Sequence, residues 1–74
     1  MNNINENHKT SKSQTERILE FMLSGNTITP MEALDKFGCF RLGARIADIK
    51  AKGYIVYSDF VTAPNGKKFK RYYL

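Results

Sequence analysis

Residues 29–53, TPMEALDKFGCFRLGARIADIKAKG, form the stretch that decides the fold of this chain. Thr29, Pro30 and Glu32 mark a helix start, with a capping residue, a proline at the first helical position and a glutamate at the third. Gly38 ends that helix after about two turns, and a second helix ends before Gly53. The stretch therefore predicts a helix over residues 30–37, a tight turn, and a helix over residues 41–52.

Apolar residues recur at helical intervals through this stretch and also upstream of it. A first helix is expected over residues 14–24. Ser13 and Glu16 stand in capping-box spacing at its start, and Gly25 suits its end. We expect three sets of core residues, one for each helix: Ile18, Leu19, Met22 and Leu23; Met31, Leu34 and Phe37; and Leu42, Ile46 and Ile49.

After Gly53 the chain changes from a helical to a strand pattern. Residues 54–62 and 67–74 are rich in β-branched and aromatic side chains. The sequence APNG at residues 63–66 between them suits a turn, and a short strand is expected at residues 27–28. The expected fold is α+β, with three helices followed by a C-terminal β-hairpin.

Length and composition predict one small domain. The 74 residues are 42% hydrophobic and 26% charged, which fits a globular domain at residues 13–74 behind a flexible polar tail at residues 1–12. Cys39 and His8 are the only residues of their types, so we expect no disulfide, metal site or cofactor. No Cys–His pair or phosphate-binding glycine loop is present in the sequence, so we expect no enzyme and no small-molecule substrate. Without a signal peptide or a long apolar run, the expected location is cytoplasmic, with no membrane partner.

The positive charge of the chain is concentrated in its second half. Eight of the 12 Lys and Arg residues lie after residue 40, against two of the seven carboxylates, and the whole chain carries a formal net charge of +5. Such an asymmetric distribution favours a polyanionic partner.

The helix expected at residues 41–52 has two distinct exposed surfaces. On a helical wheel, small side chains lie opposite the buried stripe, and charged ones form a stripe beside it. A smooth surface bordered by cations is what a helix needs to enter the DNA major groove, although alanines also occur on solvated helices for their helix propensity. The small residues are Gly43, Ala44, Ala47 and Ala51, and the charged stripe is Arg41, Arg45, Asp48 and Lys52.

The sequence also resembles a known family. Residues 28–38, 40–46 and 52–54, together with the hairpin residues 65–67 and 72–74, are similar to the small helix-turn-helix domains of bacteriophage and prophage proteins. This resemblance covers about residues 13–74 and implies a winged helix-turn-helix fold that binds DNA. It also implies that Arg41 and Arg45 occupy the recognition positions.

We therefore expect a sequence-preferring protein that binds double-stranded DNA, a transcriptional regulator of phage or prophage type in the bacterial cytoplasm. Helix 41–52 is expected in the major groove, with the wing at residues 63–68 on the DNA backbone. Arg41 and Arg45 are the candidates for base contacts, and Asp48 is expected to pair within its helix. The candidates for phosphate contacts are Lys50, Lys52, Lys67, Lys68 and Thr29, the last at a helix N-terminus.

The hairpin leaves a second reading open. If alternate residues face the helices, the other set forms an outer surface that is largely aromatic, unless the strand twist turns it into the core. Such a surface favours a homodimer, or a phage-encoded inhibitor that binds a host protein or a nucleic-acid-handling defence complex. The residues of this surface are Ile55, Tyr57, Phe69, Arg71 and Tyr73.

Overall fold

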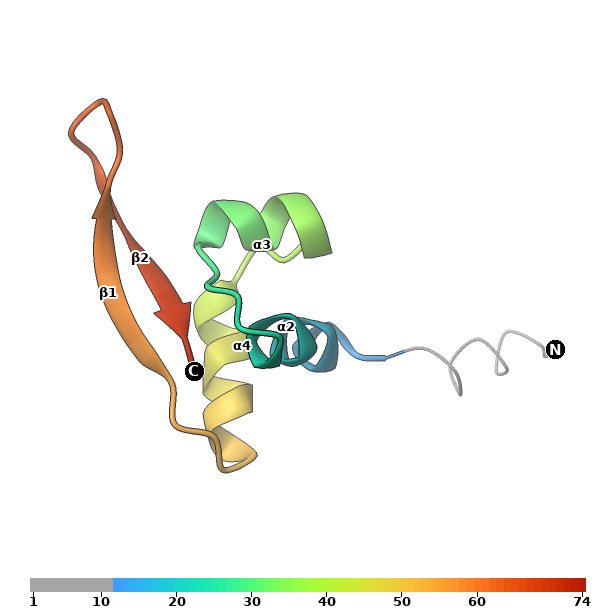
Figure 1. Ribbon diagram of the computed structural model, residues 1–74. Helices are drawn as coiled ribbons and strands as arrows, with labels where there is room; N and C mark the ends of the chain where they lie inside the picture. The colour runs from blue at the N-terminus through green and yellow to red at the C-terminus, as the bar shows by residue number, and fades with distance from the viewer. Residues whose placement is uncertain (1–11) are drawn as a thin grey trace, which may run out of the picture.

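The computed structural model describes residues 12–74. Three helices precede a two-stranded antiparallel hairpin, which confirms the expected α+β fold of the winged helix-turn-helix type (Figure 1). The expected tail, residues 1–12, lies outside the described residues except for Lys12. The elements are α2 (Gln14–Leu23), α3 (Pro30–Phe37), α4 (Leu42–Ala51), β1 (Tyr57–Thr62) and β2 (Lys68–Tyr73).

Capping boxes fix the starts of α2 and α3 where the sequence predicts them. The Ser13 hydroxyl accepts the N–H of Glu16 at 3.1 Å, and the Glu16 carboxylate accepts the N–H of Ser13 at 2.8 Å. These bonds hold the pKa of Glu16 below its ordinary value. Thr29 and Glu32 repeat the arrangement at α3. At the other end of α3, Gly38 has φ +63°, so it supplies the left-handed conformation that stops the helix.

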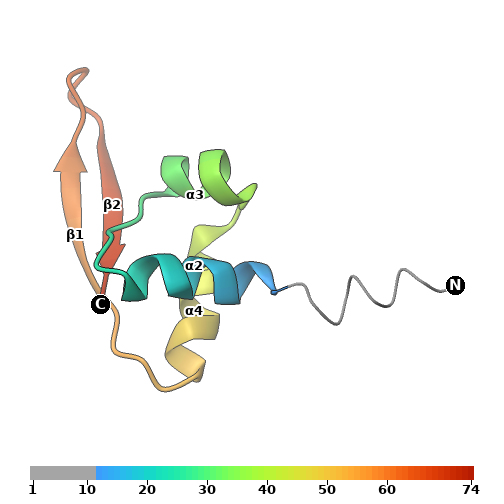
Figure 2. The same ribbon diagram turned by 45° about the vertical axis from the view of Figure 1, so that its right-hand side comes forward.

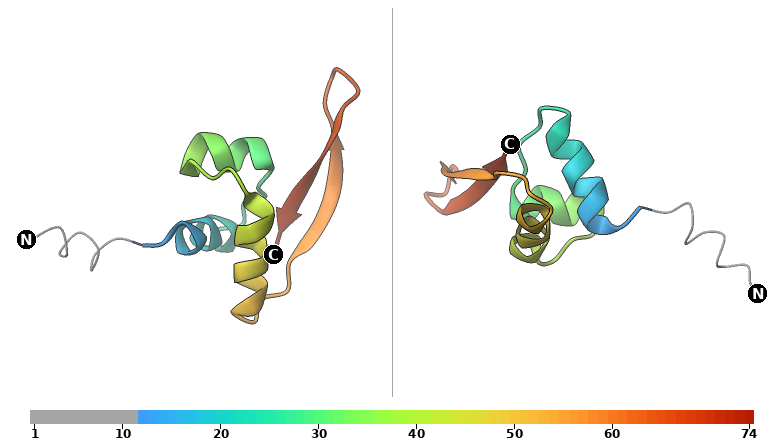
Figure 3. Two further views of the ribbon diagram at one scale, coloured as in Figure 1. Left: turned by 180° about the vertical axis from the view of Figure 1, so that it is seen from behind. Right: turned by 90° about the horizontal axis from the view of Figure 1, so that it is seen from below.

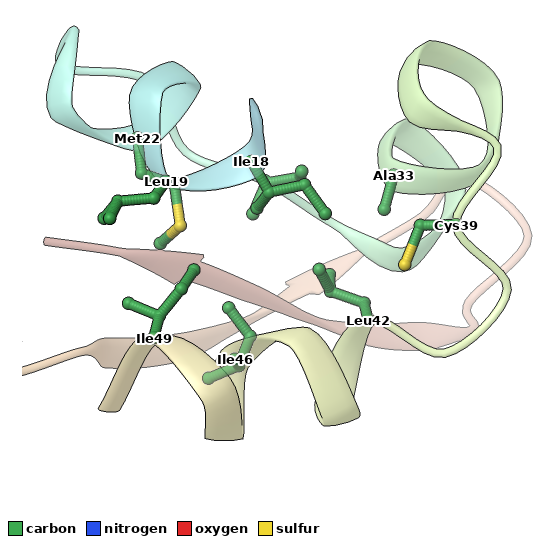
Figure 4. Close-up of a cluster of buried hydrophobic side chains, with 9 residues drawn as sticks. Ile18, Leu19, Met22, Ala33, Cys39, Leu42, Ile46 and Ile49 are labelled. Atoms are coloured by element: carbon green, nitrogen blue, oxygen red, sulfur yellow. The ribbon is translucent and has the colours of Figure 1, made fainter. Parts of the chain in front are cut away.

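The core lies where α2 crosses α4 (Figures 2 and 4), with α3 closing one side. Leu42, Ile46 and Ile49 point from α4 toward α2, as expected. From α2 the chain contributes Ile18, Leu19 and Met22, while Leu23 is exposed, contrary to expectation, because the helix ends there. The buried hydrophobic residues are Ile18, Leu19, Met22, Ile28, Ala33, Cys39, Leu42, Ile46 and Ile49.

The core side of α3 differs from the expected one. Met31 is 73% exposed and Leu34 is also exposed, whereas Ala33 is fully buried and Phe37 is half-buried against the core. Compared with the expected orientation, α3 is rotated so that Ala33 faces the core. The small side chain of Ala33 lets α3 pack closely against the neighbouring elements. In the turn that follows, Cys39 is buried and Phe40 is 85% exposed.

The hairpin is shorter than expected at its first strand. Tyr57 is paired with Tyr73 and Thr62 with Lys68, so residues 54–56 connect α4 to the sheet without a partner. The short strand expected at residues 27–28 is present as a single bridge. Ile28 and Tyr72 exchange two backbone hydrogen bonds, of 2.9 and 2.8 Å, which attach the sheet to the loop before α3.

The hairpin stands beside the helices with β1 on the outside. Seen from below, α4 lies end-on between the hairpin and α2 (Figure 3). Because β1 runs back along α4, the hairpin turn projects beyond the N-terminal end of α4 (Figure 1). The wing is thus closer to the start of α4 than to its end.

Candidate nucleic-acid interface

Arg41 occupies the N-cap position of α4, immediately after the turn from α3. Its backbone carbonyl accepts the N–H groups of Ala44 and Arg45, at 3.1 and 3.4 Å. Its side chain is exposed and makes no capping bond. Within residues 12–74 no carboxylate pairs with this guanidinium, so Arg41 presents a free cation at the start of the helix.

Arg45 lies one turn further along α4 but is held by its neighbours. Its Nε is 3.0 Å from Oδ2 of Asp48, and the same oxygen accepts the hydroxyl of Thr15 on α2 at 3.0 Å. The intrahelical pairing expected for Asp48 is therefore present. Only a third of the Arg45 side chain is exposed. Arg45 and Asp48 thus lie on the flank of α4 that faces α2.

The outer surface of α4 is smooth, as the helical wheel predicts. Gly43, Ala47 and Ala51 are exposed and Ala44 is partly so. A methyl group added at Gly43 would meet no atom within 4 Å. A partner can therefore approach the backbone of the first turn of α4 closely.

Lys50 and Lys52 lie at the opposite end of α4 from Arg41. Lys50 is in the last turn and Lys52 is the C-cap, and both are exposed. Cations at this end also complement the helix dipole, so these two lysines stabilise α4 as well as offering charge. Lys52 additionally contributes, as a lesser cause, to the lowered pKa of Glu16.

The wing turn is rigidly built. The N–H of Ala63 donates to the carbonyl of Lys67 at 2.7 Å, and the N–H of Gly66 donates to the carbonyl of Ala63 at 2.8 Å. The Asn65 side chain accepts the N–H of Lys67 at 3.0 Å, and Gly66 takes φ +86°. The turn therefore holds Lys67 and Lys68 exposed at the tip.

Lys70 lies beside the wing lysines, although it is not among the site residues expected from the sequence. Strand alternation places its side chain on the same side of β2 as that of Lys68, and it is exposed. Its Nζ lies 5.9 Å from the ring centroid of Tyr72. The alternation of side chains along residues 67–74 is the sequence signal that indicates Lys70 as a neighbour of Lys68.

Thr29 is occupied as a capping residue. Its hydroxyl accepts the N–H of Glu32 at 3.2 Å and lies 3.2 Å from Oε1 of that residue, while its N–H donates to the same carboxylate oxygen at 3.0 Å. Thr29 is also buried. The groups that were expected to bind a phosphate are therefore already paired within the protein.

Arg71 is neutralised inside the hairpin. It donates from Nε and Nη2 to the two carboxylate oxygens of Asp59, at 3.0 and 2.7 Å. The guanidinium holds the pKa of Asp59 below its ordinary value. Arg71 therefore adds little to the basic surface.

The residues expected on the outer aromatic surface of the hairpin lie in different surroundings. The rings of Tyr57 and Tyr73 are stacked with centroids 5.7 Å apart. Phe69 is half-buried in an open groove of about 600 Å³ between the hairpin and the start of α3. Ile55 is exposed on the segment before β1. The five expected residues thus do not form one continuous apolar surface, because the Asp59–Arg71 pair lies among them.

Other kinds of site are not found in the part of the chain that the structure describes. Across residues 12–74, His, Cys, Asp and Glu side chains form no group of three that could hold a metal ion. The helices in this range are too short or too polar to cross a bilayer.

Comparison with known proteins gives one match. No curated protein and no solved structure matches the chain. The model of a family described as a winged helix-turn-helix domain matches residues 13–74, which include all three helices and both strands. On this evidence the chain belongs to the winged helix-turn-helix domain family.

Proposed function

We propose that this protein is a sequence-preferring regulator that binds double-stranded DNA with α4 in the major groove and the wing on the adjacent backbone. Winged helix-turn-helix domains are generally DNA-binding modules, and α4 is in the position of the recognition helix. The observation that carries the proposal is the exposed surface of small residues on α4, bordered by Arg41, Lys50 and Lys52. The major groove of duplex DNA can receive this surface, and cations lie at both ends of it.

The residues divide by role. Arg41 has a free guanidinium at the N-terminal end of the recognition helix, which suits a bidentate contact to guanine. Arg45 is the second candidate for a base contact, and it must first exchange its pairing with Asp48 for a base edge. Lys50, Lys52, Lys67, Lys68 and Lys70 supply phosphate contacts, which fix the position of the protein without reading sequence.

Transcription regulation and a phage or prophage origin are the finer parts of this proposal. They rest on the resemblance of the sequence to small domains of that kind. One recognition helix reads few base pairs, so useful specificity favours two copies on a two-fold symmetric site. The alternative function, inhibition of a host protein, draws no support from the family match.

Selection from a random duplex DNA pool at two salt concentrations tests the proposal. We expect an enriched sequence motif and an affinity that falls steeply with salt, because lysine–phosphate contacts release counterions. A pool that yields neither a motif nor any salt-dependent binding would overturn it. Retention of a host protein in place of DNA would favour the alternative.

A further inference from the structure

The outer edge of β1 has no partner among residues 12–74. The sheet has the order β1–β2, and the additional bridge from Ile28 is made to β2. In Figure 1 and in the left view of Figure 3, β1 lies on the outside of the molecule. The backbone groups on this edge are therefore available to another strand.

The pairing of the hairpin shows which groups these are. Backbone bonds in an antiparallel pair alternate, so residues next to each other along a strand point their N–H and C=O groups in opposite directions. Ala63 bonds to Lys67, so every second residue before Ala63 bonds to β2, and Ser58, Phe60 and Thr62 point outward. The bridge from Ile28 agrees with this pattern, because Tyr72, opposite Ser58, directs its own groups away from β1.

This edge lacks the devices that keep a strand from pairing. Proteins commonly place lysine, proline or a bulge on an exposed edge. β1, with the sequence YSDFVT, contains no lysine, arginine or proline, and its one charged residue, Asp59, is paired with Arg71. β1 also exposes the large apolar side chain of Phe60, at 67%, and Ile55, just before the strand, is 71% exposed.

We propose that a second copy of this chain docks at β1, in antiparallel register with Phe60 of each copy opposite Phe60 of the other. This register pairs the outward residues with one another, since Ser58 then faces Thr62 of the second copy. Three such pairs make about six interchain backbone hydrogen bonds. The two hairpins join into one four-stranded sheet, β2–β1–β1–β2.

The side chains of β1 favour a second copy over an unrelated strand. At the two-fold axis an aromatic pair forms, and on each side of it Ser58 meets Thr62, which are both favourable cross-strand pairs. Between them Asp59 lies opposite Val61, so the register places no like charges opposite each other. The edge is thus complementary to itself, as a two-fold interface requires.

This dimer would supply the two copies that the proposed function favours, but the inference itself rests on the edge of β1 and not on DNA binding. Its test is made without DNA, so the two proposals fail separately.

Sedimentation equilibrium of the full chain tests the dimer. We expect a reversible monomer–dimer equilibrium, and Phe60→Lys should weaken the dimer by roughly tenfold or more, because it places two like charges across the axis. Phe40→Lys is the matched control, since it makes the same change at an exposed phenylalanine away from β1. A chain that stays monomeric at millimolar concentration, or a dimer that survives Phe60→Lys, would overturn the proposal.

A second measurement tests the register. The dimer should slow hydrogen exchange at the amides of Ser58, Phe60 and Thr62 as protein concentration rises, and leave Val61, which already bonds within the hairpin, unchanged. Ser58→Pro removes only an outward N–H, so it should abolish the dimer while the hairpin remains folded. Concentration-dependent protection that appears elsewhere and spares these three amides would identify another interface and contradict ours.

Discussion

Arg41 and Arg45 differ in a way that the helical wheel does not reveal. The sequence predicts both on one stripe, but Arg41 is the N-cap that precedes α4, whereas Arg45 lies within the helix beside Asp48. The two guanidinium groups differ in their availability to a partner. Thr15, far away in the sequence, holds Asp48 where it pairs with Arg45. The spacing of residues predicts which side chains share a surface, but tertiary contacts decide which of them remain available.

We predict that Arg41→Ala weakens binding to the selected DNA site by about 1–3 kcal/mol and relaxes the preference at one base pair. The reason is the loss of a guanidinium that has no carboxylate partner in the described residues. Titration of the selected duplex and of single-base variants measures both effects.

Arg17→Ala is the matched control for this change. Arg17 is an exposed arginine on α2 whose guanidinium lies 5.6 Å from the ring centroid of Phe37. It removes the same charge from the molecule without touching α4. If the two variants lose the same affinity and keep the same base preference, Arg41 does not read sequence.

The Asp59–Arg71 pair predicts an acid-dependent contribution to stability. The pKa of Asp59 is lower in the folded protein than its ordinary value, so this contribution is complete above the ordinary value and is lost as pH falls through the folded value. We expect Asp59→Asn to flatten part of the decline in stability at acid pH. Urea unfolding midpoints measured from neutral pH down to the acid limb report it.

Asp35→Asn serves as the comparison, because Asp35 is exposed and forms no ion pair within residues 12–74. It should leave the acid limb unchanged. Equal flattening by both variants would show that the ion pair is not the cause.

Among the elements, α3 shows which features of a helix can be predicted from neighbouring residues in the sequence. Its start, its length and its glycine stop follow from residues adjacent in sequence, and each was predicted correctly. Its buried side was not, because an eight-residue helix with apolar residues on several sides offers more than one packing solution. Similarly, the first strand begins at Tyr57 and not at residue 54, since pairing partners decide where a strand begins.

We predict that Thr29→Ala destabilises the fold by about 1 kcal/mol through loss of the cap of α3, and leaves DNA affinity unchanged at temperatures where the protein is folded. Urea unfolding gives the first quantity and duplex titration the second. Thr27→Ala, at an exposed threonine whose hydroxyl makes no hydrogen bond within residues 12–74, should change neither. A loss of affinity in folded Thr29→Ala would mean that this hydroxyl binds phosphate after all.

The position of Lys67 at the tip of the wing leads to a separate prediction about phosphate contacts. Lys67→Ala should weaken binding to selected and random duplexes alike and reduce the slope of log affinity against log salt by about 0.9, the value for one phosphate contact. Lys36→Ala provides the control, since Lys36 lies on α3 with its Nζ 6.0 Å from the centroid of Phe21. An unchanged slope for Lys67→Ala would place the wing tip off the DNA.

At the scale of the whole molecule, the basic residues of the second half of the chain gather in two groups, one near each end of α4. Arg41 and the wing lysines lie toward one end of α4, and Lys50 and Lys52 lie at the other. Sequence alone places these residues in the same half of the chain. It does not give their separation, which follows from the direction in which the hairpin returns along α4.

The bridge between Ile28 and Tyr72 also has a consequence for how the chain folds. Helix contacts are local and form early, whereas this bridge joins a loop to a strand that lies beyond all three helices in the sequence. Closing so large a loop costs entropy that only the completed core repays. During synthesis, β2 emerges after every helix, so the bridge between Ile28 and Tyr72 cannot form before all three helices have been made.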